Sequence, residues 1–528
     1  MLHNIPSSIF NDVLGPVMIG PSSSHTAAPA RIGQVAHMLF GKELAKIVIE
    51  FEEGGSFAVT YKAQGSDYGF IGGILGMNVI DEKLKSSPAE AEKRGIDVQF
   101  VIAPAGTPPK HPNFALINLV DKNGATLTLE AISTGGGMFE VTKYHEFPVS
   151  IQGACYQILA ICESEEILKQ VGKILTDAGV VADSRSVRGE DGRFLLNVDS
   201  EERIPEQVQR EISALDGVLF KEVLPILPIV KKREVKLPFR NTEECLEYLE
   251  ANPGKQLWEL GCDYEAAISG KSHGELLEMM KEIALIMEES GKKALTGDYE
   301  PRGFLPPQTA IIVKNLQKSR ERWVDMGLLN DAILWASAMM EYDICRGRTV
   351  AAPTGGSCGV IPGAVVYIGR QLGKSDEEIA KAMMATGLIG VFIIHQASFG
   401  GEVLGCQAEM GSACAMAAAG LVQMFGGTPK EGFAAAALTL QNMMGLICDP
   451  VAGVGNIPCV SRNSLGAANA VLSANMVMNG FDPYIPLDET IDCMWQVGNL
   501  MPTEFLCTGK GGLSATKTGK EVFERLGY

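Results

Sequence analysis

The stretch Cys155-Tyr-Gln-Ile-Leu-Ala-Ile-Cys162 begins the clearest secondary-structure pattern in this chain. It is apolar enough for a buried strand, and an amphipathic segment follows it directly. The predicted elements are, in order, a strand over 155–162, a helix over 165–178, strands over 180–187 and 193–198, a helix over 205–215 and a strand over 218–223. This βαββαβ order is that of the ferredoxin-like motif, and it makes residues 149–226 a unit of its own.

The segments on either side of this unit have different patterns. Residues 1–148 read as α/β, with strands predicted over 46–51 and 98–102 and a helix over 30–40, after Pro29. A linker with three prolines follows the unit, over residues 224–238. Residues 240–528 read as mostly helical. The fold class predicted is therefore a multidomain α+β protein with a large helical C-terminal part.

Glycines and a capping motif predict where some elements end. The Gly54-Gly55 and Gly72-Gly73 pairs and the Gly135-Gly-Gly137 triple predict tight backbone turns. Ser272-His-Gly-Glu275 is a capping box, which predicts a helix from there to about residue 289, stopped by Gly291.

Bulk composition excludes several classes of function. With 63 acidic and 45 basic residues the chain carries a net charge of −18, which opposes binding to nucleic acids and anionic membranes. The apolar run over 379–395 contains Lys381 and is shorter than the ~20 residues of a membrane span, so we expect a buried helix. The N-terminus lacks the pattern of a signal peptide, and twelve cysteines in 528 residues are no dense disulfide framework. We therefore expect a reducing, cytoplasmic location.

Three cysteines near the C-terminus are candidate metal ligands. Cys406, Cys448 and Cys459 each lie among Gly, Ala and Pro residues, which let backbone approach a bulky inorganic group. Thiolates are the ligands of iron–sulfur clusters, and three of them leave one iron of a 4Fe–4S cluster open as a Lewis acid. On spacing alone, buried structural thiols are the better interpretation, because no C-x-x-C pattern is present.

The motifs around these cysteines resemble a known family. The segments Gly405–Gly420, Cys448-Asp-Pro-Val-Ala-Gly453 and Ile457-Pro-Cys-Val-Ser-Arg-Asn463 are similar to the catalytic part of iron–sulfur-dependent L-serine dehydratases. Ile19-Gly-Pro-Ser-Ser-Ser-His-Thr26 resembles the β-domain signature of that family, as if its β and α parts were fused in one chain. The resemblance implies a 4Fe–4S cluster on Cys406, Cys448 and Cys459, deamination of L-serine to pyruvate and ammonia, and a homo-oligomer, such as a dimer.

The same resemblance suggests the remaining site residues. His25 is the first candidate for the base that takes the α-proton, because histidine titrates near neutral pH, although the Gly20–Thr26 segment could equally be a turn that caps a helix. His111 is the second candidate. Polar side chains and Gly-rich turns that could bind the substrate are Ser23, Ser24, Thr26, Asn113, Ser133, Gly135, Gly136, Thr354, Gly355, Gly356 and Ser398. Arg462-Asn463 could pair with a carboxylate or form a structural ion pair, and the other nine cysteines are expected in the core.

Residues 149–226 resemble an ACT domain, a small regulatory module of amino-acid enzymes. The place of its usual ligand loop is taken by Glu163-Ser-Glu-Glu-Ile167, so a structural or oligomerising role is as good an interpretation as amino-acid binding.

Departures from the family pattern leave the substrate open. Ala63-Gln-Gly-Ser-Asp67 stands where the family commonly has Gly-His-Gly-Thr-Asp, and residues 295–302 and 396–405 also differ. Threonine, cysteine or another β-substituted amino acid is therefore an alternative substrate. Two other hypotheses are a pyridoxal-phosphate lyase, for which Lys271 lacks a convincing Schiff-base context, and an ACT-based amino-acid sensor. Since no cysteine follows Cys507, we expect solvent or a small anion on the fourth iron, not a protein thiolate.

Overall fold

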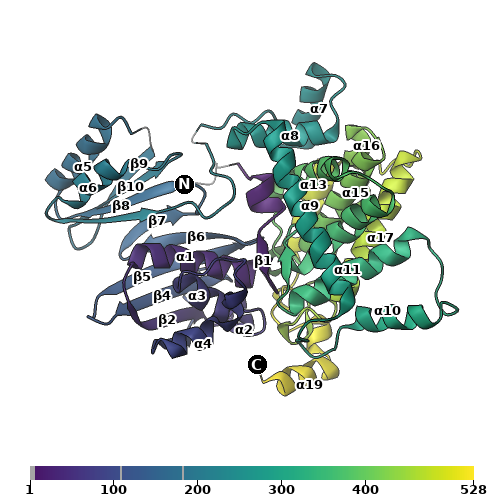
Figure 1. The fold of residues 1–528 in the computed structure, drawn as a ribbon, viewed down its shortest axis with the longest axis horizontal. Helices are drawn as coiled ribbons and strands as arrows, with labels where there is room; N and C mark the ends of the chain where they lie inside the picture. Colours follow the sequence, from purple (N-terminus) through teal and green to yellow (C-terminus); the bar gives the residue numbers. More distant parts are fainter. Residues whose placement is uncertain (1–5, 107–109, 181–182, 233, 528) are drawn as a thin grey trace.

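The N-terminal region is built on a six-stranded sheet with helices on one face (Figure 1). The computed structural model describes residues 6–106, 110–180, 183–232 and 234–527. The strand order is β3-β2-β4-β5-β6-β7; β2 and β3 are parallel and the other neighbours antiparallel. The strands are β2 (Leu44–Glu52), β3 (Asp97–Ala103), β4 (Phe114–Asp121), β5 (Thr126–Gly135), β6 (Met138–Tyr144) and β7 (Phe147–Ile151). The strands predicted over 46–51 and 98–102 are confirmed.

Two close-packed helices cover this sheet, α1 (Ala28–Phe40) and α3 (Ser66–Ile74). The prediction that Gly72-Gly73 forms a turn is wrong, because both glycines lie inside α3. A Cβ on Gly73 would lie 2.0 Å from the carbonyl oxygen of Ala30, so the glycine allows the two helices to approach. The triple Gly135–Gly137 does turn the chain as predicted, with φ of 93°, 59° and 84°. Short helices α2 (Ser56–Thr60) and α4 (Ser87–Lys93) complete the region.

The second unit has the predicted order of elements. Its four-stranded antiparallel sheet has the order β11-β8-β10-β9. The elements are β8 (Tyr156–Cys162), α5 (Glu165–Asp177), β9 (Asp183–Arg188), β10 (Phe194–Ser200), α6 (Glu206–Ser213) and β11 (Val218–Val223). Residues 181–182 of the strand predicted over 180–187 lie outside the described residues. One sheet face carries α5 and α6, while Leu159, Ile161 and Leu195 join the core of the first sheet, so the two units share a core.

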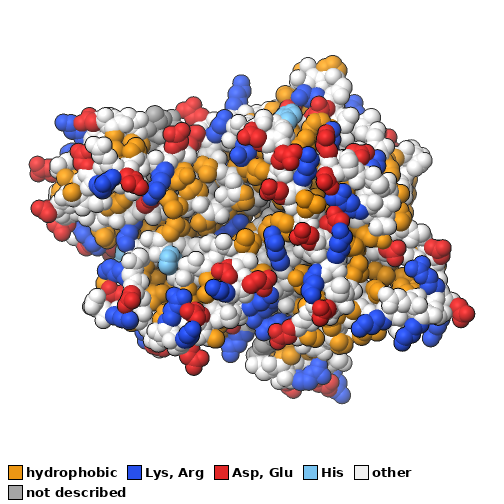
Figure 2. Space-filling view, viewed as in Figure 1, with side chains coloured by type: hydrophobic (Ala, Val, Ile, Leu, Met, Phe, Trp, Pro, Cys, Tyr) orange, Lys and Arg blue, Asp and Glu red, His pale blue; other side chains and the backbone are white. Residues whose placement is uncertain are grey.

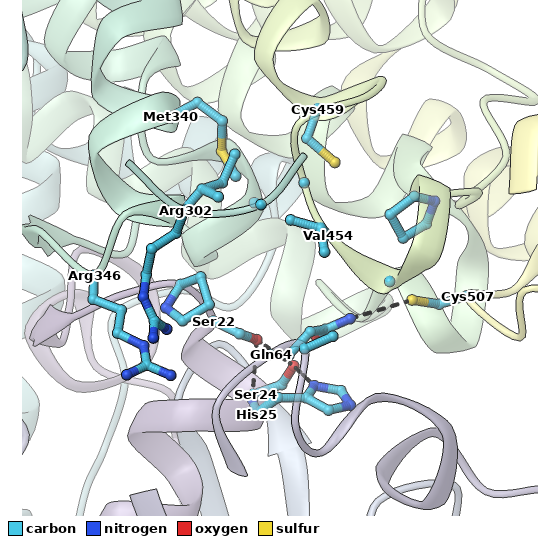
Figure 3. A pocket seen from close by; sticks show the side chains of 18 of the residues that line it. Ser22, Ser24, His25, Gln64, Arg302, Met340, Arg346, Val454, Cys459 and Cys507 are labelled. Atoms are coloured by element: carbon cyan, nitrogen blue, oxygen red, sulfur yellow. Dashed lines mark hydrogen bonds between the residues drawn. The ribbon is translucent and has the colours of Figure 1, made fainter. Parts of the chain in front are cut away.

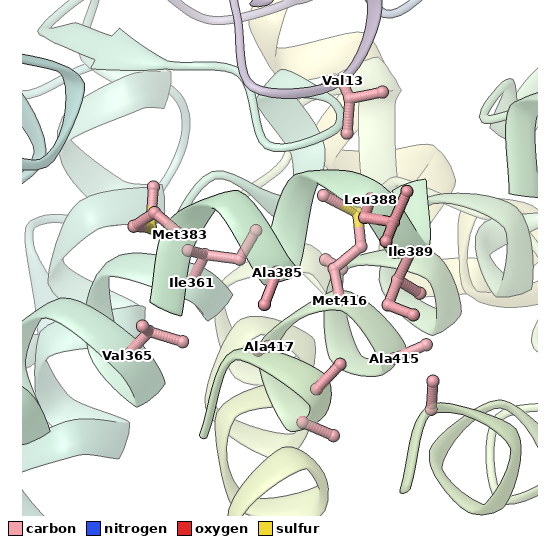
Figure 4. Packing of buried hydrophobic residues seen from close by; sticks show 14 of the residues in the cluster. Val13, Ile361, Val365, Met383, Ala385, Leu388, Ile389, Ala415, Met416 and Ala417 are labelled. Atoms are coloured by element: carbon pink, nitrogen blue, oxygen red, sulfur yellow. The ribbon is translucent and has the colours of Figure 1, made fainter. Parts of the chain in front are cut away.

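The C-terminal half is a helical bundle, as predicted, centred on α13 and α15 (Figures 1 and 4). In Figure 4, Leu388 and Ile389 of α13 pack beside Ala415 and Met416 of α15. The helices are α7 (Thr242–Ala251), α8 (Leu257–Ser269), α9 (His273–Thr296), α10 (Gln308–Lys318), α11 (Leu328–Ile344), α12 (Ile368–Gln371), α13 (Asp376–Gln396), α14 (Gly401–Leu404), α15 (Ser412–Met424), α16 (Pro429–Gln441), α17 (Cys459–Met478), α18 (Leu487–Asn499) and α19 (Lys517–Leu526).

Helix α13 is long and apolar enough to cross a membrane by length and composition, and it is the one such helix among the described residues. In the bundle, 78% of its most apolar window is buried against other helices, which agrees with the expected core helix.

Acidic and basic side chains are interspersed over the face shown in Figure 2.

Helix α9 begins at the predicted capping box, where Ser272 accepts a hydrogen bond from the N–H of Glu275. The predicted end at Gly291 is wrong, since the helix continues to Thr296 and stops at Gly297, which has a φ of 63°. A Cβ on Gly291 would lie 2.1 Å from the indole of Trp335. The glycine therefore admits a neighbouring ring instead of ending the helix.

Residues 6–20 join the two halves of the molecule. Strand β1 (Val17–Ile19) pairs antiparallel with β12 (Arg348–Val350) of the C-terminal half. The π-helical turn Ile9–Val13 packs against α13. The chain segment that follows β1 therefore lies at the junction of the sheet region and the helical bundle.

Candidate active site

A cavity of 470 Å³ lies at this junction, between segments that are far apart in the sequence (Figure 3). The sheet region contributes Pro21, Ser22, Ser24, His25 and residues 62–64. From the helical half come residues 300–303, the end of α11, two glutamates, three cysteines and the last turn of α19. The polar and sulfur-bearing side chains that line the cavity are Ser22, Ser24, His25, Lys62, Gln64, Glu300, Arg302, Met340, Arg346, Glu402, Glu409, Cys448, Cys459 and Cys507.

His25 is held in a network of serine hydroxyls. Ser22 caps the π-helical turn Ser23–Ala27, which runs directly into α1, and accepts a hydrogen bond from the His25 N–H at 3.0 Å. The ring nitrogens lie 2.7 Å (Nδ1) from the Ser24 Oγ and 3.0 Å (Nε2) from the Ser56 Oγ. Burial lowers the pKa of His25 to about 3, so the imidazole is neutral at pH 7 rather than titrating near that pH as expected. The segment is therefore both a turn that caps a helix and the part of the chain that places His25 in the cavity.

The three predicted ligand cysteines converge from separate elements. Cys406 follows α14, Cys448 lies in the loop after α16, and Cys459 is the first residue of α17. Cys448 and Cys459 line the cavity, and Cys406 is buried beside it. Arg462, one turn into α17, acts electrostatically on both Cys406 and Cys459. The positive charge of Arg462 therefore lies where it would stabilise the thiolates of Cys406 and Cys459.

Cys507 is the third cysteine that lines the cavity, and it is buried at the edge of the core of the helical half, as expected. Its N–H donates to the Cys448 carbonyl oxygen at 2.9 Å, and the nearby Cys507 thiol and burial together raise the pKa of Cys448. The backbone of Cys507 has a φ of 61°, a conformation that side chains other than glycine seldom adopt. No spacing pattern in the sequence distinguishes this cysteine. Cys493 was expected in the core with the other cysteines that are not predicted ligands, but it is exposed.

The predicted ligands are three thiols, and thiolates are the ligands that an iron–sulfur cluster takes. Among the described residues, no three His, Cys, Asp or Glu side chains come close enough to hold one metal ion. In a cluster each thiolate binds a different iron, so its ligands are spread more widely. A Cβ on Gly401 would lie 3.1 Å from the Cys448 Sγ, which shows how closely backbone approaches the thiols. Residues Cys406, Cys448 and Cys459 therefore fit the predicted group.

Two half-buried glutamates that line the cavity, Glu402 and Glu409, were not predicted. Glu402 accepts a hydrogen bond from Asn113 Nδ2 at 2.8 Å, and burial raises its pKa. Burial, and then repulsion from Glu402, raise the pKa of Glu409 to about 8, although the Thr354 hydroxyl donates a hydrogen bond to it. Both lie near the cluster motif in sequence, Glu409 three residues after Cys406. A pair of perturbed carboxyls in a cavity is typical of acid–base chemistry.

Several predicted substrate-binding residues form the walls around this cavity. Ser23 Oγ accepts a hydrogen bond from the Gly355 N–H at 3.1 Å, joining the first motif to the Pro353–Gly359 loop. Gly356 reaches the cavity, where a Cβ would lie 2.8 Å from the Glu409 Oε2. Thr26 donates to the carbonyl of Gln64 at 2.6 Å.

Other predicted residues lie further back. A Cβ on Gly135 would approach Gly400, and one on Gly136 would lie 3.5 Å from the Pro353 carbonyl oxygen, so these glycines pack loops together. The residues predicted at the site that do not line the cavity themselves are Ser23, Thr26, His111, Asn113, Ser133, Gly135, Gly136, Thr354, Gly355, Ser398 and Cys406.

The structure also bears on two alternatives raised by the sequence: the role of Arg462-Asn463, and Lys271 as the Schiff-base lysine of a pyridoxal-phosphate lyase. Arg462 forms an ion pair with Asp449 at 3.0 Å, and Asn463 Oδ1 accepts from the Gly359 N–H at 2.9 Å, which favours the structural interpretation of this pair. Lys271 is not among the residues that line the cavity.

Comparison with known proteins places the chain in a family. Residues 221–514 match the model of the serine dehydratase alpha chain family, and the chain belongs to that family. It is 36% identical over 290 residues to the probable L-serine dehydratase alpha chain of Bacillus subtilis, covering 54% of this chain and 95% of the relative. It is 33% identical over 279 residues to the L-serine dehydratase alpha chain of Peptoniphilus asaccharolyticus, covering 51% and 92%.

The chain also resembles the second subunit of such an enzyme. It is 38% identical over 215 residues to the probable L-serine dehydratase beta chain of Bacillus subtilis, covering 40% of this chain and 95% of the relative. One polypeptide here thus combines regions that are similar to an alpha chain and to a beta chain, as the sequence motifs suggested.

Proposed function

We propose that this protein removes water from L-serine, giving pyruvate and ammonia, at a 4Fe–4S cluster held by Cys406, Cys448 and Cys459. Family membership supports the reaction, since the alpha-chain and beta-chain relatives are named as L-serine dehydratases. The observation that carries the proposal is that the cavity gathers His25 from the N-terminal motif and Cys448 and Cys459 from the C-terminal motif.

The elimination step breaks two bonds of serine, Cα–H and Cβ–O. A base removes the proton from Cα, and the hydroxyl leaves Cβ with a second proton as water. The resulting aminoacrylate tautomerises to an imine, which water hydrolyses to pyruvate and ammonia. Because hydroxide is a poor leaving group and the α-proton is weakly acidic, the site must stabilise both changes.

A cluster bound by the three thiolates would supply an open iron that acts as a Lewis acid toward the hydroxyl. The residues around it would handle the protons. His25 is neutral, so its imidazole can accept a proton, and the Ser24 and Ser56 hydroxyls fix the orientation of its ring. Glu402 and Glu409 have raised pKa values, so the protonated form of either can donate a proton to the leaving oxygen.

The substrate class can be tested directly. The purified protein is loaded with iron and sulfide under anaerobic conditions and mixed with L-serine, L-threonine or L-cysteine. The 2-oxo acid and the ammonia released are then measured. We expect equimolar pyruvate and ammonia from L-serine, with the largest kcat/KM of the three substrates. Faster turnover of threonine or cysteine would reassign the substrate, and no product from any of them would refute the proposal.

A further inference from the structure

Two arginines line the part of the cavity that the proposed chemistry does not use. Arg302 belongs to the loop between α9 and α10, and Arg346 follows α11. Figure 3 shows their side chains converging beside Ser22, with both guanidinium groups away from the sulfurs of Cys459 and Cys507. Each of these arginines is half-buried.

The backbone holds the two arginines next to each other. The N–H of Arg302 donates to the Sγ of Cys345 at 3.3 Å, and Cys345 directly precedes Arg346. Arg346 has a φ of 60°, a backbone angle that residues other than glycine adopt only where their surroundings require it. Its guanidinium carbon lies 4.1 Å from the centre of the Tyr68 ring, a cation–π contact that fixes the side chain.

The loop that carries Arg302 is fixed from its other side as well. The N–H of Phe304 donates to Asn456 Oδ1 at 3.2 Å, and a Cβ on Gly303 would lie 1.8 Å from that same oxygen. Only glycine at position 303 therefore allows the loop to lie so close. The two arginines are thus held in place by the backbone and side chains around them.

The charge of the cavity is unevenly distributed. Lys62, Arg302 and Arg346 are its basic residues. Its acidic residues are the exposed Glu300 and, near the thiols, Glu402 and Glu409. Behind the arginines, Asp67 feels the positive charge of both. The arginine side of the cavity is therefore suited to an anion.

We propose that Arg302 and Arg346 bind a carboxylate of the amino-acid substrate. Planar guanidinium groups bind carboxylates through paired, charge-assisted hydrogen bonds, and two of them converge here. The carboxylate is either the α-carboxylate of a neutral amino acid or the second carboxylate of an acidic one. The inference rests on the proposed function, which places the amino-acid substrate in this cavity. It adds that the two arginines select substrates with a carboxylate.

Binding without turnover tests the subsite. L-Alanine, L-aspartate and L-alaninamide lack a β-hydroxyl leaving group, so their affinities for the iron-loaded protein are measured by calorimetry. The variants are Arg302→Met and Arg346→Met, with Arg302→Lys and Arg346→Lys to keep the charge, and Arg320→Met as an exposed control. Thermal unfolding of each variant shows whether it is folded.

We expect both Met variants to bind a carboxylate ligand at least about tenfold more weakly, as for loss of a charge-assisted hydrogen bond, with partial recovery in the Lys variants. If the α-carboxylate is bound, alanine binding is lost and alaninamide does not bind the parent protein. If a second carboxylate is bound, only aspartate binding is lost.

Unchanged alanine and aspartate affinities in both folded Met variants would overturn the subsite. That outcome is separate from failure of the proposed function, which is decided by product formation in the parent protein. A parent that binds alanine through the arginines but releases no product would leave the subsite standing and the reaction refuted.

Discussion

At the scale of single residues, the surroundings of His25 decide what it can do. Both ring nitrogens have a serine hydroxyl within hydrogen-bond distance, and Phe57 packs edge-on with its ring centre 5.0 Å away. Burial with no acidic partner among these contacts explains the low pKa. A neutral, oriented imidazole is a base that does not need to lose a proton first.

We expect His25→Ala to lower kcat by about 10²–10⁴-fold, the usual contribution of a general acid–base group, without loss of bound iron. His273→Ala is the matched control, because His273 lies outside the cavity and pairs with Asp263. Steady-state assays and iron analysis of both variants check this. If His25→Ala kept the parent kcat and a full complement of iron, the segment would be a structural turn only.

At the scale of elements, a buried carboxyl ties the N-terminal turn to the helical bundle. Glu265 of α8 accepts hydrogen bonds from the Ser8 hydroxyl at 2.6 Å and the Ile9 N–H at 2.7 Å. Burial raises its pKa from 4.5 to about 7, with Asp12 raising it further and Lys231 lowering it. This contact positions the chain that leads through β1 to the cavity.

The raised pKa makes stability depend on pH. The folded protein holds the Glu265 proton more tightly than the unfolded chain, so this stabilisation is complete below about pH 4.5 and is lost as the pH rises through about 7. We expect Glu265→Gln to remove this dependence. Between about pH 5 and about pH 7.5 the unfolding free energy of the parent should fall relative to the variant, by at most about 1.4 kcal/mol per pH unit. Urea unfolding of both proteins measures it; a constant difference across this range would contradict the assignment.

Local patterns predicted the elements well where neighbours in the sequence determine them. The βαββαβ unit and the start of α9 at Ser272 follow from periodicity and capping. The glycines misled prediction where tertiary packing decides, since Gly73 and Gly291 lie inside helices against Ala30 and Trp335. A glycine that admits a neighbour and one that ends a helix look the same in the sequence.

At the scale of the whole molecule, the site exists because a segment near the start of the chain meets segments near its end. Ser22 and His25 follow β1, which is anchored on β12, and Cys507 and α19 close the cavity from the C-terminal side. His25, Cys448 and Cys459, which the motifs singled out, line the cavity, and Cys406 lies beside it; their roles stay predictions. Glu402 and Glu409 flank Cys406 in the sequence and were overlooked, whereas only long-range packing brings Cys507 to the cavity. The expected dimer, the cytoplasmic location and a solvent ligand on the fourth iron stay predictions.

The central claim, that Cys406, Cys448 and Cys459 hold a 4Fe–4S cluster, is tested most directly by iron and acid-labile sulfide analysis. The parent protein and the three single Ser variants are loaded under anaerobic conditions, with Cys414→Ser as a buried control and Cys493→Ser as an exposed one. We expect about four irons and four sulfides per chain in the parent and both controls, and loss of both elements in each ligand variant. A Cys448→Ser variant that kept the iron and sulfide of the parent would contradict the account.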